Sequence, residues 1–190
     1  MTLQNFTLGT FAQGAAGGGG AFESIATATG TGSANTITFT SIPGTYQHLQ
    51  IRGIGKGTYN QDSAGAIAVT VNSDTSSAYN YHWLTGSGIG AAAGGSASDT
   101  AMWLGNAVNS GSGVTNMTNA VVIDVLDYGS TSKNKTFRAF DGNDRNGSGA
   151  IYLFSGLWRS TSAITSITLK NNDGNWTTST TFALYGIKGA

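Results

Sequence analysis

Apolar and polar residues alternate along several segments of the chain, which is the pattern of half-buried β-strands. In residues 46–54, Leu49 and Ile51 fall on one face, whereas His48 and Arg52 fall on the other. The same pattern predicts strands in eleven segments: 22–29, 35–40, 46–54, 66–72, 79–84, 100–105, 119–127, 134–140, 150–158, 164–170 and 180–187.

One of these segments is apolar on both faces. In residues 119–127, valine and isoleucine occupy every second position, and Asp124 lies on the other face beside Val122 and Leu126. We therefore expect this second face to be partly covered as well.

The short predicted strands are separated by Gly, Ser, Asn and Asp, which favour tight turns. This predicts an all-β fold, a two-sheet β-sandwich of the jelly-roll type. Asn-Asp-Gly at 172–174 predicts a hairpin turn. Residues 85–99 are expected to form a long loop that is uncharged until Asp99. Small neutral residues suit either a close subunit contact or a mobile surface loop.

The first 21 residues predict an extended, glycine-rich N-terminal arm, followed by one sandwich domain over 22–190. A run rich in glycine extends from Gly14 to Gly20. The arm is either a frayed terminus or a segment docked on a partner. In the second case its partner-binding residues are the four apolar anchors, Leu3, Phe6, Leu8 and Phe11.

The low charge content argues against a nucleic-acid partner and favours contact with other protein subunits. Nine basic residues balance nine acidic ones, and charged residues are only 9% of the chain, against about 25% in a typical soluble domain. A nucleic-acid partner is not expected, because phosphate binding needs a basic surface. No apolar run approaches the length of a membrane-spanning helix. Because sheet edges are usually protected by Lys or Pro, the single proline and low charge favour a subunit covered by other subunits.

Candidate catalytic residues are few. The chain contains no nucleophile elbow, dinucleotide-binding fingerprint, P-loop or H-E-x-x-H motif. His48 and His82 lie in different predicted strands, so we do not expect a joint metal site or a catalytic triad. Asp141 and Asp144 are a possible acid–base pair, but they stand among Gly and Asn, where Asp usually stabilises turns. We expect no enzyme activity and no catalytic residues.

Metal and cofactor sites are not expected either. Residues 144–149 match the start of a calcium loop, but its twelfth position is Ser155 in place of an acid. The absence of cysteine excludes thiolate sites and disulfides.

The tryptophans raise the question of carbohydrate binding, because aromatic faces near Asn and Asp can hold sugars. Trp83, Trp103 and Trp158 fall within predicted strands, where packing in the core or an interface is the more common role. Trp176 lies in the turn-rich stretch 171–179 and is the best exposed candidate for a glycan contact.

Several phrases of the chain resemble a family of virion structural proteins from tailed bacteriophages, particularly phages of cyanobacteria and other aquatic hosts. The resemblance covers residues 22–189 and is carried by ESIATATGTG, ITFTSIPGTYQHLQIRGIG, VVIDVLDYGSTSKNKTFRAF, GSGAIYLFSGLWRSTSAITSITL and FALYGIKG. Similar domains occur as capsid cement (decoration) proteins and as tips of head or tail fibres. The resemblance implies a trimeric β-sandwich in the virion and no catalytic residues.

We therefore expect a capsid cement protein on the outer surface of the icosahedral head, with the major capsid protein and its own copies as partners. Only about 21 residues precede the sandwich, and they show no fibrous repeat, which favours this role over a fibre shaft. A subunit that binds only the assembled shell stabilises it by linkage. The alternative is a receptor-binding or fibre-tip module that contacts host surface glycans.

Overall fold

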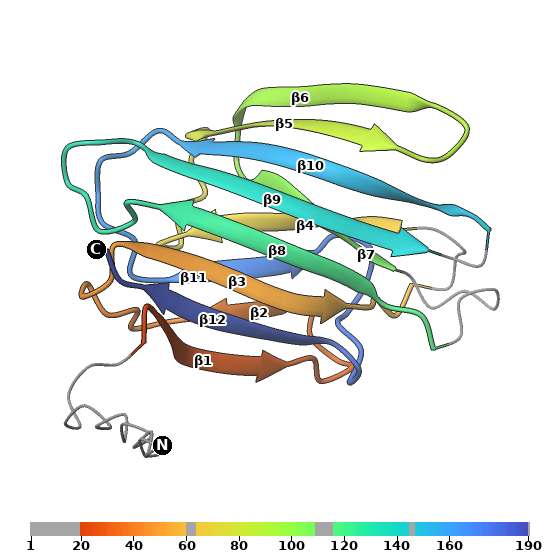
Figure 1. The fold of residues 1–190 in the computed structure, drawn as a ribbon, viewed down its shortest axis with the longest axis horizontal. Coiled ribbons are helices and arrows are strands. Elements are labelled where there is room, and N and C mark those ends of the chain that lie inside the picture. Colours follow the sequence, from red (N-terminus) through yellow and green to blue (C-terminus); the bar gives the residue numbers. More distant parts are fainter. Residues whose placement is uncertain (1–19, 60–63, 109–115, 145–146, 190) are drawn as a thin grey trace, which may run out of the picture.

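The computed structural model describes residues 20–59, 64–108, 116–144 and 147–189 (Figure 1). No helix occurs in these ranges. The strands are β1 (Phe22–Thr29), β2 (Thr36–Phe39), β3 (His48–Gly55), β4 (Ala64–Val71), β5 (Tyr79–Gly86), β6 (Ala91–Asp99), β7 (Met102–Val108), β8 (Asn119–Leu126), β9 (Lys135–Asp144), β10 (Gly149–Trp158), β11 (Ile167–Asn171) and β12 (Thr181–Ile187).

The strands form two antiparallel sheets that lie one behind the other (Figure 1). The larger sheet has the strand order β1-β12-β3-β8-β9-β10-β5-β6, and the smaller one has the order β2-β11-β4-β7. This confirms the predicted all-β fold with two sheets. The jelly-roll type stays a prediction.

The core lies between the sheets and follows from the alternation. Leu49 and Ile51 of β3 are fully buried, and Ile123 of β8 is buried opposite Ile51. The smaller sheet contributes residues such as Val69 and Leu169, which pair across β4 and β11. Burial of these aliphatic side chains is the main stabilising contribution to a fold that is poor in charge.

All eleven predicted segments overlap strands, with ends that differ by up to four residues, but the predicted loop over residues 85–99 is wrong. β5 continues to Gly86, and Ala91–Asp99 returns antiparallel to it as β6. The turn between them is closed by a hydrogen bond from the Ser87 amide to the Gly90 carbonyl oxygen at 3.0 Å. Alanine and glycine have low strand propensity, so pairing with β5 decides this strand.

The predicted hairpin at residues 172–174 is also wrong. These residues do form a turn, in which the Asp173 amide donates to the Asn171 Oδ1 at 3.1 Å. However, β11 before the turn and β12 after it belong to different sheets. The turn therefore starts a crossing from one layer of the sandwich to the other.

Candidate functional site

Four large apolar side chains lie together on the outer face of the eight-stranded sheet, the face turned away from the smaller sheet. Their exposed fractions are 53% for Leu84, 55% for Phe140, 58% for Ile151 and 48% for Leu153. We call these four residues the apolar patch. Contiguous apolar surface of this kind marks interaction sites on soluble proteins.

The strand register makes the patch continuous. Leu153 of β10 pairs with Phe140 of β9 on one side and with Leu84 of β5 on the other. Directly paired residues share a face of the sheet and stand about 5 Å apart. The three side chains therefore form one row across three strands.

Beside this row the surface is hollowed. Ile151 pairs with Gly142 on one side and with Gly86 on the other, so neither neighbouring strand places a side chain next to it. An apolar hollow of about 270 Å³ results, lined by residues that include Ala91 of β6, Tyr152 and the patch itself. Its shape and lining suit an aliphatic or aromatic side chain.

The patch exists because β10 is apolar on both faces. Phe154 points into the core and is 1% exposed, while Ile151 and Leu153 point outward. The signal was present in the predicted strand 150–158, whose first five residues (AIYLF) contain no polar position that alternates with the apolar ones. The pattern is the same as in 119–127, where it predicts a second covered face, and it predicts the apolar patch in the same way.

Toward β1 the same face becomes polar. The Gln50 Nε2 donates to the Asp124 Oδ1 at 2.6 Å, and the Arg52 Nε donates to the Gln50 Oε1. The Arg52 guanidinium also lies 5.3 Å from the ring centroid of Phe22 and 6.0 Å from that of Tyr185. These groups satisfy one another. Ile54 and Leu126 are also exposed on this half of the sheet, but they do not pair with each other or with the patch.

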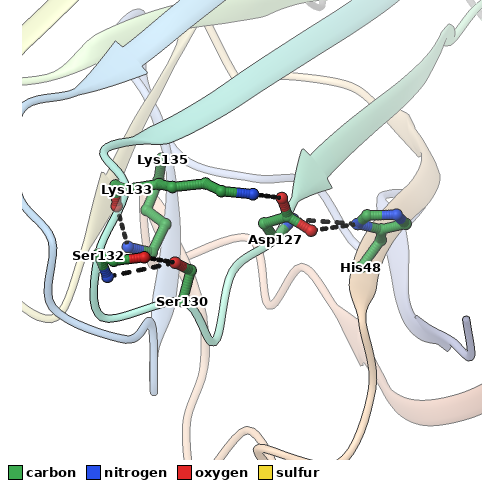
Figure 2. A network of polar contacts seen from close by, with 6 residues as sticks. All are labelled: His48, Asp127, Ser130, Ser132, Lys133 and Lys135. Carbon is green, nitrogen blue, oxygen red and sulfur yellow. Dashed lines mark hydrogen bonds and ion pairs between the residues drawn. The ribbon is translucent and has the colours of Figure 1, made fainter.

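A second polar cluster surrounds the connection between β8 and β9 (Figure 2). The Lys133 Nζ lies 2.9 Å from the Asp127 Oδ2, and this hydrogen bond lowers the pKa of Asp127 below its usual range. The His48 Nδ1 accepts a hydrogen bond from the Asp127 amide at 3.0 Å. It is 3.7 Å from the carboxylate, too far for a hydrogen bond. The buried Lys135 Nζ donates to the carbonyl oxygens of Lys133 and Thr161. This cluster holds a turn in place.

The predicted turn role of Asp141 is wrong, because β9 extends through Asp144 and carries Asp141 into the core. Its side chain is fully buried. The Asn106 Nδ2 donates to its Oδ2 at 3.0 Å, whereas its Oδ1 has no partner. Burial raises the pKa of Asp141 to about 7, against the opposing effect of hydrogen bonds from Asn106 and Asn119. The group affects stability and has no access to a substrate.

The other candidate catalytic and metal-ligating residues lie apart from one another. Asp144 is exposed at the end of β9, so it does not face the buried Asp141. His48 on β3 and His82 on β5 are separated by three strands of the sheet. Within the described ranges, no three His, Cys, Asp or Glu residues lie close enough together to hold a metal ion. The calcium-like segment 144–149 includes residues outside the described ranges.

Trp176 is not exposed as expected. Its side chain is fully buried, its ring packs edge-on against Phe182 with centroids 5.3 Å apart, and its Nε1 donates to the Leu169 carbonyl oxygen at 3.3 Å. It therefore cannot contact a glycan in this conformation. Trp158 is buried in the core, and Trp83 and Trp103 are partly buried and pack against each other, as expected.

The arm anchors Leu3, Phe6, Leu8 and Phe11 lie outside the described residues. In the described part of the chain, no helix is long and apolar enough to cross a membrane. Comparisons with models of known protein families, with curated proteins and with solved structures find no match to this chain.

Proposed function

We propose that this protein is a capsid cement protein that binds the outer surface of a phage head and clamps the shell without turnover. The observation that carries the proposal is the apolar patch on the outer face of the large sheet. Sandwich strands normally alternate inward apolar with outward polar residues. Four half-exposed large apolar residues side by side indicate a face that another protein chain covers.

Two further features support this proposal. The chain has a formal net charge of zero and few charged residues, which makes it poorly suited to remain dispersed as a free monomer. The phrases that resemble virion structural proteins are distributed over residues 22–189, which is nearly the whole folded domain. A subunit that binds only the assembled shell raises its stability by mass action, in the absence of any catalytic group.

Co-sedimentation with capsids that lack this protein tests the proposal. We expect the full chain to bind expanded capsids saturably and at high copy number. The double variant Leu153→Ser/Phe140→Ser is expected to bind at least tenfold more weakly. Each half-exposed side chain still has roughly 1 kcal/mol of apolar burial to gain from a partner, and about 1.4 kcal/mol is a factor of ten.

The matched control is Leu126→Ser, which removes an exposed leucine from β8, beyond the patch. It is expected to bind as the parent does. A chain without residues 1–21 separates the roles of the arm and the sandwich, because binding that survives the truncation would assign the contact to the sandwich. If the full chain does not bind capsids, the cement proposal is wrong.

The alternative, a fibre-tip module that contacts host glycans, is favoured by a different feature. A groove of about 550 Å³ runs over the outer face of the smaller sheet, lined by threonines together with Trp103, Tyr81, Asp99 and Lys170. Aromatic rings beside hydroxyl and charged groups suit a sugar. Binding to host cells that a glycan competes away, and that Trp103→Ala weakens at least tenfold, would replace the cement proposal with this one.

A further inference from the structure

The edge strand β6 is long and carries few of the features that protect sheet edges. It spans Ala91–Asp99, is the last strand in the order of the large sheet, and has no charged residue before Asp99. Within the described residues, β5 is the one strand that pairs with it. Free edges of this kind are templates for pairing with another chain.

The opposite edge of the same sheet differs. Both edge strands have one irregularity in register, between Ser24 and Ala26 in β1 and between Ser96 and Asp99 in β6. In β1, Glu23 accepts from the Lys188 Nζ at 2.6 Å and from the Tyr46 hydroxyl at 3.0 Å. Charged residues protect an edge from pairing, whereas residues 91–96 of β6 pair regularly with β5 and carry no charge. The two edges of the large sheet are therefore not equivalent, and β6 is the open one.

The open edge adjoins the apolar patch. Ala93 of β6 pairs with Leu84 of the patch, and Ala91 pairs with Gly86 beside the hollow next to Ile151. Both alanines therefore face outward with the patch. The alanine methyl groups occupy little space. A large side chain on a strand added beside β6 can therefore extend across them to the hollow next to Ile151.

The chain contains a segment that fits this edge. Residues 3–11 carry no charged side chain and no proline. Phe6 and Leu8 are two residues apart and therefore fall on one face of an extended strand. An added strand would place both over the alanines and the patch, with main-chain hydrogen bonds to β6, which is the general form of β-strand addition.

The position of the arm favours a neighbouring copy as its source. Gly20, where the described chain starts, leads into β1 at the far edge of the sheet from β6 (Figure 1). An added strand would lie eight inter-strand steps from β1, roughly 38 Å at about 4.8 Å per step. The twelve residues from Leu8 to Gly20 span at most about 43 Å. To reach β6 of its own chain, the arm would therefore have to cross the full width of the large sheet almost fully extended. A neighbour's arm has no such constraint.

We propose that β6 and the apolar patch accept residues 3–11 from a second copy of this chain as an added strand, with Phe6 and Leu8 covering the patch. A closed oligomer in which each copy donates one arm and receives one satisfies every arm, either by reciprocal exchange in a dimer or by head-to-tail contacts in a ring such as a trimer. The inference rests on the proposed function in treating the protein as a subunit of an assembly. It makes a second copy the chain that covers the patch, so Leu153→Ser/Phe140→Ser weakens capsid binding through loss of the oligomer that docks on the shell.

The first test measures the oligomeric state in solution, without capsids, by sedimentation velocity over a range of concentrations. The full chain is expected to form a closed oligomer, and removal of residues 1–19 to give monomers. Ala93→Lys places a charge at the open edge and is expected to weaken association at least tenfold. Ala120→Lys is the matched control, because Ala120 is an exposed alanine on the same face of β8, and it is expected to associate as the parent does.

The second test uses the absence of cysteine in the chain. Chains with Thr10→Cys, a position on the same face of an extended strand as Phe6 and Leu8, are mixed with chains with Ala93→Cys and treated with a short bismaleimide. Dimers cross-linked between the two variants are expected from the mixture, and few from either variant alone. Replacing Ala93→Cys by Ala120→Cys is expected to abolish most of this product.

Three results would overturn the inference: a monomeric full chain, an oligomer that survives arm removal, or a mixture of the two cysteine variants that yields no cross-linked dimer. The outcome for capsid binding is separate. A full chain that is monomeric yet binds capsids through its arm would retain the cement proposal and refute the exchange of arms. An oligomer that depends on the arm but does not bind capsids would support the exchange of arms and refute the cement proposal.

Discussion

Asp141→Asn is expected to stabilise the folded protein by up to about 4 kcal/mol at pH 8 and to leave its stability at pH 4 nearly unchanged. The reason is that Asp141 is fully buried with a pKa raised to about 7, whereas an unfolded aspartate has a pKa of about 3.9. Ionised Asp141 in the core is therefore a cost that asparagine does not carry.

The sign follows from proton binding. Between about pH 4 and pH 7 the Asp141 carboxyl keeps its proton in the folded state but has lost it in the unfolded state. Stability therefore falls by about 1.4 kcal/mol for each pH unit over this range, and above pH 7 the loss is complete. The opposite trend comes from Glu23 and Asp127, whose pKa values are lowered by hydrogen bonds from lysines, so only the difference between parent and variant isolates Asp141.

Urea unfolding at pH values from 4 to 8 measures this difference. The asparagine side chain keeps an acceptor for the Asn106 amide and adds a donor where the Asp141 Oδ1 has no partner. Asp144→Asn removes a carboxylate from the same strand at an exposed position and is expected to change little. Parallel pH profiles for the parent and Asp141→Asn would contradict the raised pKa.

Trp176→Ala is expected to destabilise the fold by about 3–5 kcal/mol, the usual cost of deleting a buried tryptophan. The indole fills the space between the two sheets, where it packs against Phe182 of one and donates to Leu169 of the other. Its backbone amide also donates to the Ala34 carbonyl oxygen at 2.8 Å. The loss is large beside a typical total stability of 5–15 kcal/mol.

The midpoint of urea unfolding measures the effect, and Trp176→Phe, which retains an aromatic ring without the Nε1 donor, is expected to fall between alanine and the parent. If Trp176 were an exposed glycan contact, Trp176→Ala would leave the midpoint unchanged and weaken sugar binding only. A loss of cell binding in this variant therefore says nothing about glycans unless the protein is shown to be folded.

The errors in the sequence prediction have identifiable causes. The turn residues around Trp176 predict an exposed side chain, but a turn that crosses between sheets can direct one large side chain into the core. The Gly and Asn around Asp141 predict a turn. The period-two pattern of β9 already placed it on the inward face with Phe137 and Ala139, both 1% exposed, and that pattern was the stronger signal.

The amino-acid sequence by itself determined the all-β class, eleven of the strands in the described ranges, and the inward face of strands such as β3, because side-chain alternation is a local property of the chain. Only the tertiary structure decided the rest. β6 exists because β5 offers a pairing edge to residues with no strand pattern of their own. The apolar patch exists because pairing places residues far apart in sequence, Leu84 and Phe140, on either side of Leu153. Both features depend on long-range pairing, and the pattern within one strand does not determine which residues of a distant strand lie beside it.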